Sequence, residues 1–457
     1  MRLNDIAALL NTRFTQTASP CDAKPNMTNQ PLENTLVLSV GIDSRHVTPG
    51  QLFVAIQGER FDGHTFIPDA VKKGAIGVVC LHAIPDVDIP QFVVADTIQA
   101  LADIATFHRR QIVNAGIIAL TGSNGKTTVK EMIASILPQP SFATSGNFNN
   151  HLGAPLSVLQ LQPKHRYAVF ELGANHQGEI AHTVSIVKPQ VALINNIAPA
   201  HIGEFGSIDG VASAKGEIYK GLTENGIAVV NDDDDYAHFW DNALVDKQVI
   251  RFSSRHKATV HAQDIAFDEH GCAQFILVVP EGSVHIQLTV PGAHNVSNAL
   301  AAAACTSALG ISLTDIQRGL SQFSGVKGRM TFLPGKQNAV IIDDTYNANL
   351  RSVLTALDVL AKRDGCRIFV FGDMGELGPW SEQHHREVGL AARDLGIDKL
   401  MTCGIQSEAA SQAFGVGATH YTSQDDLVSD LKLDATTTVL VKGSRSSAME
   451  NIVHCLV

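Results

Sequence analysis

Short apolar runs alternate with longer stretches of mixed polarity along most of the chain, which indicates buried strands joined by helices. In the middle of the chain the apolar runs are residues 168–170, 191–194 and 227–230. Toward the C-terminus the same alternation returns, with apolar runs at residues 340–342, 368–371, 399–401 and 439–441. Strands that alternate with helices predict largely parallel sheets covered by helices, so we expect an α/β protein.

This pattern divides the chain into three predicted domains, and a length of 457 residues also suggests about three. Residues 1–96 combine short strands and helices in a small N-terminal α/β domain. Residues 97–327 form a central mononucleotide-binding sheet of the P-loop type, with an antiparallel extension predicted over 250–290. After a glycine-flanked basic linker, residues 328–457 form a Rossmann-like, doubly wound domain that lacks the Gly-x-Gly-x-x-Gly fingerprint of dehydrogenases.

The strongest local motif is Thr-Gly-Ser-Asn-Gly-Lys-Thr-Thr, between an apolar strand that starts at Gly116 and a helix predicted over 127–136. Its glycines let the backbone approach an anion, Lys126 can reach terminal phosphates, and Thr127 can ligate Mg²⁺. Leu120 stands where the strict pattern has a glycine, so the loop is a shortened variant. An ordinary glycine turn is the alternative to ATP or GTP binding. The loop residues are Thr121, Gly122, Ser123, Asn124, Gly125, Lys126, Thr127 and Thr128.

Three reactive side chains follow the central strands, where the carboxyl ends of parallel strands line a ligand crevice. Glu171 ends the first of these runs and offers a hard oxygen to Mg²⁺ beside nucleotide phosphates. His201 lies in the loop after residues 191–194, and Lys215 starts a helix beyond it. Exposed or structural roles remain the alternatives for a loop carboxylate or a lone histidine. The run Asp232–Asp235 has no ligand spacing and predicts a solvated turn.

Two other segments have polar groups suited to a ligand. Ser44 and Arg45 precede an apolar strand, and arginine offers a rigid fork of donors to a phosphate or carboxylate, although a solvated turn is the alternative. Asn295 and Asn298 share one helix face, where they can meet an adenine or ribose edge, unless Asn295 is only an N-cap. Polar clusters at three strand ends of the last domain also suggest a binding face: 343–349, 372–378 and 442–445.

Composition narrows the class of protein. A net charge of -11 without a basic cluster argues against nucleic-acid binding. No apolar run approaches membrane-spanning length, and Met1–Leu10 lacks the basic and apolar regions of a secretion signal, so we expect a cytoplasmic protein without membrane contact. The 7 cysteines are scattered and are expected to be reduced.

Taken together, these motifs resemble the Mur ligases, which build the peptide stem of cell-wall precursors. The phosphate loop, the segments of Glu171 and His201, Ala-Lys-Gly-Glu, His-Asn-x-x-Asn-Ala, Gly-Arg and Asp343-Asp344 occur in the family's order along the whole chain. Asp-Asp-Thr-Tyr-Asn-Ala-Asn and Gly-Asp-Met-Gly-Glu-Leu-Gly resemble the members that join D-alanyl-D-alanine to UDP-N-acetylmuramoyl-tripeptide with ATP. Leu350 departs from the family pattern, which usually has proline there.

The resemblance implies a role for each matching residue. Lys126 holds ATP phosphates, Thr127 and Glu171 hold one Mg²⁺, and His201 with a carbamylated Lys215 holds a second; a salt-bridged, unmodified Lys215 is the alternative. Further ATP contacts come from Asn295, Asn298, Arg329, Asp344 and Tyr346. Substrate contacts come from Ser44 and Arg45 for uridine diphosphate, Asn149 and Asn150 for the peptide, and Lys442, Ser444 and Arg445 for the dipeptide.

Two other classes of function stay open. The first is another ligase of the superfamily, either the enzyme that adds the third residue or a folylpolyglutamate synthase. Folylpolyglutamate synthases lack a first domain with the Asp-Ser-Arg and Gly-His-Thr-Phe segments that this chain carries. The other rival is a phosphate-loop switch, which would hydrolyse nucleotide without either peptide substrate. We expect a monomer that acts on small molecules.

Overall fold

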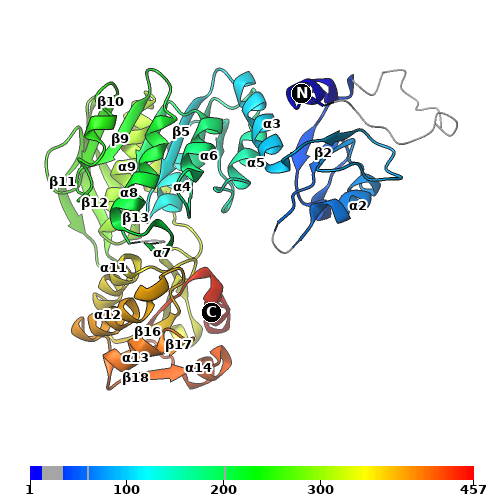
Figure 1. The fold of residues 1–457 in the computed structure, drawn as a ribbon. Helices are drawn as coiled ribbons and strands as arrows, with labels where there is room; N and C mark the ends of the chain where they lie inside the picture. The colour runs from blue at the N-terminus through cyan, green and yellow to red at the C-terminus, as the bar shows by residue number, and fades with distance from the viewer. Residues whose placement is uncertain (13–33, 59–60, 200–201) are drawn as a thin grey trace. The chain divides into compact units, whose positions relative to one another are not determined.

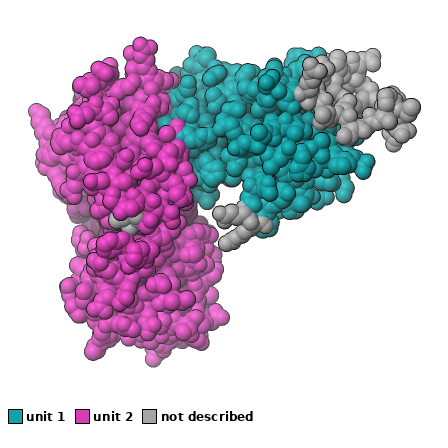
Figure 2. Space-filling model, viewed as in Figure 1, with its two compact units in different colours: residues 1–117, 139–172, 182–188 teal, residues 118–138, 173–181, 189–457 magenta. Residues whose placement is uncertain are grey.

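A computed structural model describes residues 1–12, 34–58, 61–199 and 202–457 (Figure 1). The chain forms two compact units (Figure 2). Unit 1 comprises residues 1–117, 139–172 and 182–188, and unit 2 comprises residues 118–138, 173–181 and 189–457. Each unit is described by itself below.

Unit 1 contains a four-stranded parallel sheet in the order β1 (Ser39–Gly41), β2 (Gln51–Val54), β3 (Gly77–Cys80) and β4 (Gln91–Val93). Every residue of β2 and β3 is buried, as expected for strands covered on both faces. Helices α1 (Leu3–Leu9) and α3 (Thr97–Gln111) pack against one of its two cores, and α2 (Ile67–Lys72) packs against the other. The small N-terminal α/β domain is thus present.

Unit 1 also includes chain that the sequence pattern assigns to the central domain. Strands β6 (Ser141–Ala143) and β7 (Tyr167–Glu171) pair in parallel, with α5 (Gly153–Leu159) between them along the chain. Leu101 and Ile104 of α3 are buried in the same core as Phe92 of the N-terminal sheet. Apolar residues of α5 pack against that core too. Residues 97–117, 139–172 and 182–188 of the predicted central domain thus belong to unit 1, where α3 and α5 pack against the N-terminal core. The domain bounds 97–327 stay a prediction.

The central sheet of unit 2 runs in the order β13-β12-β11-β10-β9-β8-β5. Strands β5 (Gly116–Thr121), β8 (Val191–Ile194), β9 (Ile227–Asn231), β10 (Gln248–Ser253) and β11 (Val260–Phe267) pair in parallel. Strands β12 (Cys272–Val279) and β13 (Gly282–Pro291) continue the sheet in antiparallel fashion, which confirms the predicted extension. The helices of this part are α4 (Lys126–Ile136), α7 (Ile202–Phe205), α8 (Ile208–Lys220), α9 (His294–Ala308) and α10 (Leu313–Gln322).

The C-terminal part of unit 2 has a six-stranded sheet in the order β14-β15-β19-β16-β17-β18. Only its edge strand β14 (Thr331–Pro334) runs antiparallel to its neighbour. The other strands are β15 (Val340–Asp344), β16 (Cys366–Gly372), β17 (Lys399–Cys403), β18 (Ala418–Tyr421) and β19 (Thr437–Lys442).

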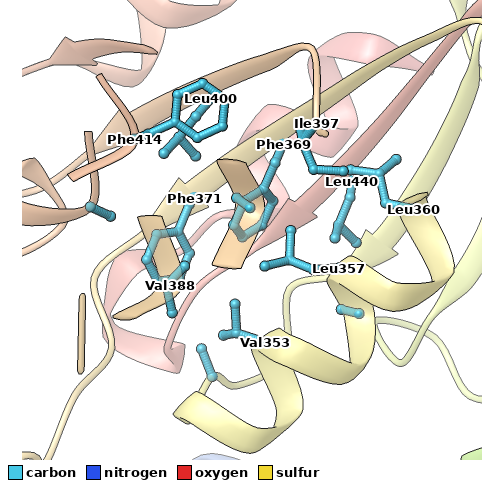
Figure 3. Packing of buried hydrophobic residues seen from close by; sticks show 14 of the residues in the cluster. Val353, Leu357, Leu360, Phe369, Phe371, Val388, Ile397, Leu400, Phe414 and Leu440 are labelled. Carbon is cyan, nitrogen blue, oxygen red and sulfur yellow. The ribbon is translucent and has the colours of Figure 1, made fainter. Parts of the chain in front are cut away.

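Alternate residues of these strands point into two cores, as strand geometry requires. Phe369 and Phe371 of β16 pack with Leu357 of α11 (Leu350–Ala361) and Val388 of α12 (Ser381–Asp394), as Figure 3 shows. Ile368 and the other alternate residues face a second core beside α14 (Gln424–Asp430) and α15 (Glu450–Leu456). Helices therefore cover both faces, and the predicted Rossmann-like, doubly wound arrangement is confirmed.

Candidate active site

The phosphate loop has the predicted strand, turn and helix, with β5 ending at Thr121 and α4 beginning at Lys126. Gly125, the residue before the helix, has φ +77°, and a β-carbon there would lie 2.6 Å from Asn298 Oδ1. Only glycine fits such a position without strain or displacement of a neighbour. The ammonium of Lys126 turns back over the loop and donates to Gly122 O at 2.7 Å. A cation and the N-terminus of a helix therefore meet at this turn, as anion binding requires.

Side-chain amides outside the loop hold its shape. Asn196 accepts from the backbone N–H of Asn124 at 2.9 Å and donates to the carbonyl of Asn124 at 3.0 Å. Asn195 Nδ2 donates to Asn124 O at 2.9 Å and to Asn298 Oδ1 at 3.2 Å. Asn298 in turn donates to Asn295 Oδ1 at 3.0 Å. The loop is thus braced by its neighbours, and Asn295 and Asn298 take part in the bracing; their predicted contact with adenosine stays a prediction.

Lys215 lies in the interior of α8 and is only 2% exposed. Burial, reinforced by the positive charge of Lys126, lowers the pKa of Lys215 to about 7. An amine with that pKa is largely uncharged in mildly alkaline solution, unlike an ordinary lysine. The positive charge of Lys126 thus acts on Lys215, the second predicted catalytic lysine. His201 lies outside the described residues.

Arg329 connects the linker to the phosphate loop. Its Nη2 donates to Thr127 Oγ1 at 3.2 Å, and its guanidinium lies 4.0 Å from the ring centroid of Tyr346. Stacking on an aromatic face is a common arrangement for arginine. Within the described residues, its buried Nε has no hydrogen-bond partner. Three predicted ATP-binding residues are thus in contact with one another.

The start of α11 also contacts the phosphate loop. Asn349 caps this helix and donates Nδ2 to Asn124 Oδ1 at 2.7 Å. Arg351 Nη1 donates to Ile197 O at 2.9 Å, in the segment after β8. Leu350 is the first helical residue, a position that also suits proline, so the departure from the family pattern leaves the helix start intact. The contacts of Asn349 and Arg351 with the segments after β5 and β8 were not predicted from the sequence, although Asn349 ends the motif Asp-Asp-Thr-Tyr-Asn-Ala-Asn.

The predicted dipeptide-binding residues are already engaged with protein groups. Lys442 is buried, and its Nζ lies 2.5 Å from Asp344 Oδ2 and 3.0 Å from Asn347 O. Burial lowers the pKa of Lys442, while the Asp344 carboxylate opposes that shift. Ser444 is also buried, and the more exposed Arg445 pairs with Glu450 at 2.7 Å. Their contact with substrate stays a prediction.

In unit 1 the turn that follows β1 carries Ser44 and Arg45. Arg45 pairs with Asp43 through two contacts, Nε to Oδ1 at 2.9 Å and Nη2 to Oδ2 at 2.7 Å, and its side chain is 81% exposed. This pairing holds the pKa of the Asp43 carboxyl below its usual range. Lys73, which sequence reasoning missed, donates to the backbone carbonyl of Ser44 at 2.8 Å.

Glu171, at the end of β7, belongs to unit 1, and Lys126 and Thr127 belong to unit 2. It is 3% exposed, and Asn149 Nδ2 donates to its Oε1 at 2.9 Å. The buried Oε2 has no hydrogen-bond partner among the described residues, so a hard oxygen is available to a cation. Asn150 instead accepts from Gly153 N at 2.8 Å near the start of α5. Groups of three or more His, Cys, Asp or Glu suited to a metal do not occur in the described part of the chain.

The prediction that residues 232–235 form a solvated turn is wrong for three of the four aspartates, because their carboxylates bind protein groups. Asp232 pairs with Arg251 at 2.7 Å, and Asp233 accepts from Ser254 N at 2.7 Å. The Asp234 side chain is 5% exposed and accepts from Ile197 N at 3.0 Å. Burial raises the pKa of Asp234. Asp234 thus orders the segment after β8, and Asp232 and Asp233 bind residues at the end of β10. The sequence of four aspartates alone does not reveal these contacts.

Comparison with known proteins places this arrangement in a family. Three family models match consecutive segments: the Mur ligase family, catalytic domain, at 37–109; the Mur ligase middle domain at 120–306; and the Mur ligase, glutamate ligase domain, at 328–445. The UDP-N-acetylmuramoyl-tripeptide–D-alanyl-D-alanine ligase of Escherichia coli K12 is 47% identical over 425 residues, which cover 92% of this chain and 93% of that protein. The chain belongs to the Mur ligase family.

Solved structures of Mur ligases agree in fold with this Mur ligase. A crystal structure of MurF from Acinetobacter baumannii has a TM-score of 0.88 and 38% identity, covering 99% of this chain and 98% of that one. A structure of MurF from Thermotoga maritima in complex with ADP has a TM-score of 0.81 and 26% identity, covering 92% and 97%. The α/β class and the three-domain architecture of this Mur ligase are thereby supported over nearly the whole chain.

Proposed function

We propose that this Mur ligase joins D-alanyl-D-alanine to UDP-N-acetylmuramoyl-tripeptide, with conversion of ATP to ADP and phosphate. The observation that carries this function is the 47% identity, across 92% of the chain, to the E. coli protein named for that reaction. The reaction supplies the UDP-linked pentapeptide of peptidoglycan precursor synthesis.

The chemistry requires an activated carboxylate, because a carboxylate at neutral pH does not acylate an amine. The terminal carboxylate of the tripeptide attacks the γ-phosphorus of ATP, which forms an acyl phosphate and releases ADP. The dipeptide amine then attacks the acyl carbon, the C–O bond to phosphate breaks, and the nitrogen loses a proton. Lys126 and the N–H groups at the start of α4 balance the phosphate charge in the first step. Arg329, which donates to Thr127 and stacks on Tyr346, brings a second cation to the phosphate loop.

The family motifs assign ligands for two Mg²⁺ ions. Thr127 and Glu171, whose Oε2 has no partner among the described residues, would hold one ion, and His201 with Lys215 as its carbamate would hold the second. Bound Mg²⁺ supplies charge neutralisation to the phosphates. A pKa of about 7 supports carbamylation of Lys215, since only the uncharged amine adds to carbon dioxide.

The substrate contacts are assigned by the family motifs. Ser44 and Arg45 bind the uridine diphosphate, Asn149 and Asn150 contact the tripeptide, and the loop with Lys442, Ser444 and Arg445 receives the dipeptide. We further propose a cytoplasmic monomer. In the described part of the chain, helices that are both long and apolar enough for a membrane crossing do not occur.

Mass spectrometry of the products tests this function. The enzyme is incubated with ATP, Mg²⁺, D-alanyl-D-alanine and two UDP-tripeptides, whose third residues carry one or two carboxylates. We expect a UDP-pentapeptide and phosphate only when both peptide substrates are present. Phosphate release without them would favour a nucleotide switch. In a parallel incubation with a UDP-dipeptide and a free amino acid, product formation would favour the ligase that adds the third residue.

A further inference from the structure

The loop between β16 and α12, residues 373–380, is fixed at its start. The Asp373 carboxylate accepts three backbone N–H groups before α13 (Glu408–Phe414): Ile405 at 3.0 Å, Gln406 at 3.0 Å and Ser407 at 2.7 Å. Met374 is 2% exposed and Leu377 is 3% exposed, and both belong to the core beneath the sheet. The loop is thus held to the core at its buried residues, and Glu376 and Gly378 lie at the surface.

His385 of α12 also holds this loop, because its side chain accepts a hydrogen bond from Met374 N. It is 0% exposed, and its ring lies 5.7 Å from that of Phe371. Nδ1 lies 2.7 Å from Ser381 O, which can only accept, and Nε2 lies 2.9 Å from Met374 N, which can only donate. These partners require the neutral tautomer with its proton on Nδ1, and burial lowers the pKa of His385 in the same sense.

The segment that His385 holds has two polar neighbours. On one side, a β-carbon built on Gly375 would lie 3.7 Å from Ser444 Oγ. The Ser444 hydroxyl is itself 3.0 Å from that of Ser446, and Ser444 N donates to Asp373 O at 2.8 Å. Hydroxyl groups can donate to and accept from a small polar ligand such as a dipeptide carboxylate.

On the other side, the same segment contacts α7. A β-carbon built on Gly203 would lie 3.5 Å from Glu376 O and 3.7 Å from Gly378 N. Helix α7 begins at Ile202, directly after His201, the predicted metal ligand. Glu376 has φ +62°, which is unusual for a residue other than glycine and persists only where the surroundings hold it. The segment therefore lies close to the serine cluster on one side and to α7 on the other.

We propose that His385 is a positioning residue for the acceptor: through the N–H of Met374 it sets segment 374–378 as one wall of the D-alanyl-D-alanine site. This inference rests on the proposed function, because it concerns the same acceptor. His385 does not touch the substrate. Its loss lets the wall move, which weakens capture of the dipeptide and leaves ATP and the UDP-tripeptide in place.

A matched pair of substitutions tests this role. His385→Asn keeps a polar group near Nδ1 but removes the acceptor at Nε2, whereas His385→Gln places an amide oxygen where Nε2 accepts from Met374. We expect His385→Asn to raise KM for D-alanyl-D-alanine about tenfold, with KM for ATP and UDP-tripeptide within about twofold of wild type. His385→Gln should restore the dipeptide KM to within about threefold of wild type. His384→Asn, at the neighbouring buried histidine, is the control and should leave all three KM values unchanged.

Two results would overturn the proposal: equal dipeptide KM values for His385→Asn and His385→Gln, or a parallel rise of all three KM values. Wild-type enzyme that forms no product with D-alanyl-D-alanine would instead refute the proposed function. If His385→Asn does not fold, hydrogen exchange of the wild-type enzyme with an ATP analogue and UDP-tripeptide decides. Added D-alanyl-D-alanine should slow exchange across residues 373–380, and unchanged exchange there would contradict the wall.

Discussion

The phosphate loop and the Ser44–Arg45 turn are both predicted to bind phosphate groups, yet the protein holds them in different ways. The phosphate loop is fixed by distant side chains, with Asn195 and Asn196 from the end of β8 and Asn349 from α11. The turn is held by Asp43, two residues away, and by Lys73 on its carbonyl groups. Arg45 is 81% exposed, whereas Lys215 beside the phosphate loop is 2% exposed.

The two sites therefore differ in how far their binding groups are ordered before a ligand binds. A loop whose hydrogen-bond donors are already fixed in place loses little conformational entropy on binding. Its charges therefore contribute more of their interaction energy to the ligand. An exposed arginine that already pairs with a carboxylate must exchange one partner for another, and water screens both interactions. Changes in the loop should therefore affect catalysis strongly, and changes in the turn should affect one substrate weakly.

The largest effect is expected for Lys126→Met. Removing the cation that faces the phosphates should lower kcat/KM by a factor on the order of 1000, because no other loop side chain replaces its charge. Steady-state phosphate release in the presence of both peptide substrates measures this loss. Lys220→Met, at the exposed end of α8, is the control and should retain wild-type rates. A loss below about tenfold for Lys126→Met would mean that the loop does not depend on this charge.

Gly125→Ala should be nearly as damaging to the loop. The new methyl group would meet Asn298 Oδ1 at 2.6 Å at a residue with φ +77°, so we expect about 2 kcal/mol of destabilisation and a large loss of ATP binding. Calorimetry of unfolding and of ATP binding measures both. Gly310→Ala has a similar φ of +73° but nothing within 4 Å, so it should show the backbone strain and normal ATP binding. Equal ATP affinities for the two variants would contradict the bracing by Asn298.

A smaller, reversible effect is expected at Lys215. Because its pKa is lowered to about 7, its amine is mostly neutral above that pH and protonated below it. Carbamylation needs the neutral amine, so the carbamate-dependent activity should be lost as pH falls through about 7. At pH near 8, removal of dissolved carbon dioxide should lower the rate several-fold, roughly as for loss of one metal ligand, and bicarbonate should restore it.

The control for this experiment is Lys215→Met, which should be slow and should not respond to bicarbonate. A wild-type rate that is indifferent to bicarbonate would support the alternative of an unmodified, salt-bridged lysine.

The smallest effect is expected for Arg45→Lys in the exposed turn. A lysine cannot reproduce the two-point fork of arginine, so KM for the UDP-tripeptide should rise about three- to tenfold, with KM for ATP unchanged. Initial rates at varied UDP-tripeptide measure the change. Arg110→Lys, at an exposed arginine of α3, should have no effect. A rise in KM for ATP would show that the turn and the phosphate loop do not act separately.

Local sequence patterns were sufficient to predict the strands and the phosphate loop. The apolar run at 227–230 became β9, and the helix after Gly125 began one residue earlier than predicted. These features depend on the periodicity of apolar side chains and on glycine at a turn, and both can be read from residues close together in the sequence.

Features that depend on distant partners could not be predicted in this way. Asp234 was expected in water, but it accepts from Ile197 N, 37 residues earlier in the chain. The role of Asn195 and Asn196 in bracing the phosphate loop was not predicted, because adjacent asparagines after a strand are typical of an ordinary loop. The assignment of α3 and α5 to unit 1 depends on the core against which they pack. The apolar face of an amphipathic helix shows that the helix packs against something, but not against which sheet.

The bond between Asn349 and Asn124 has a consequence for inhibitor discovery. A fragment of the protein cut after the central sheet would present a nucleotide loop without the amide that α11 contributes. Compounds selected against such a fragment would be fitted to a surface that the intact enzyme does not display. Screens for ATP-competitive inhibitors therefore belong on the full-length chain.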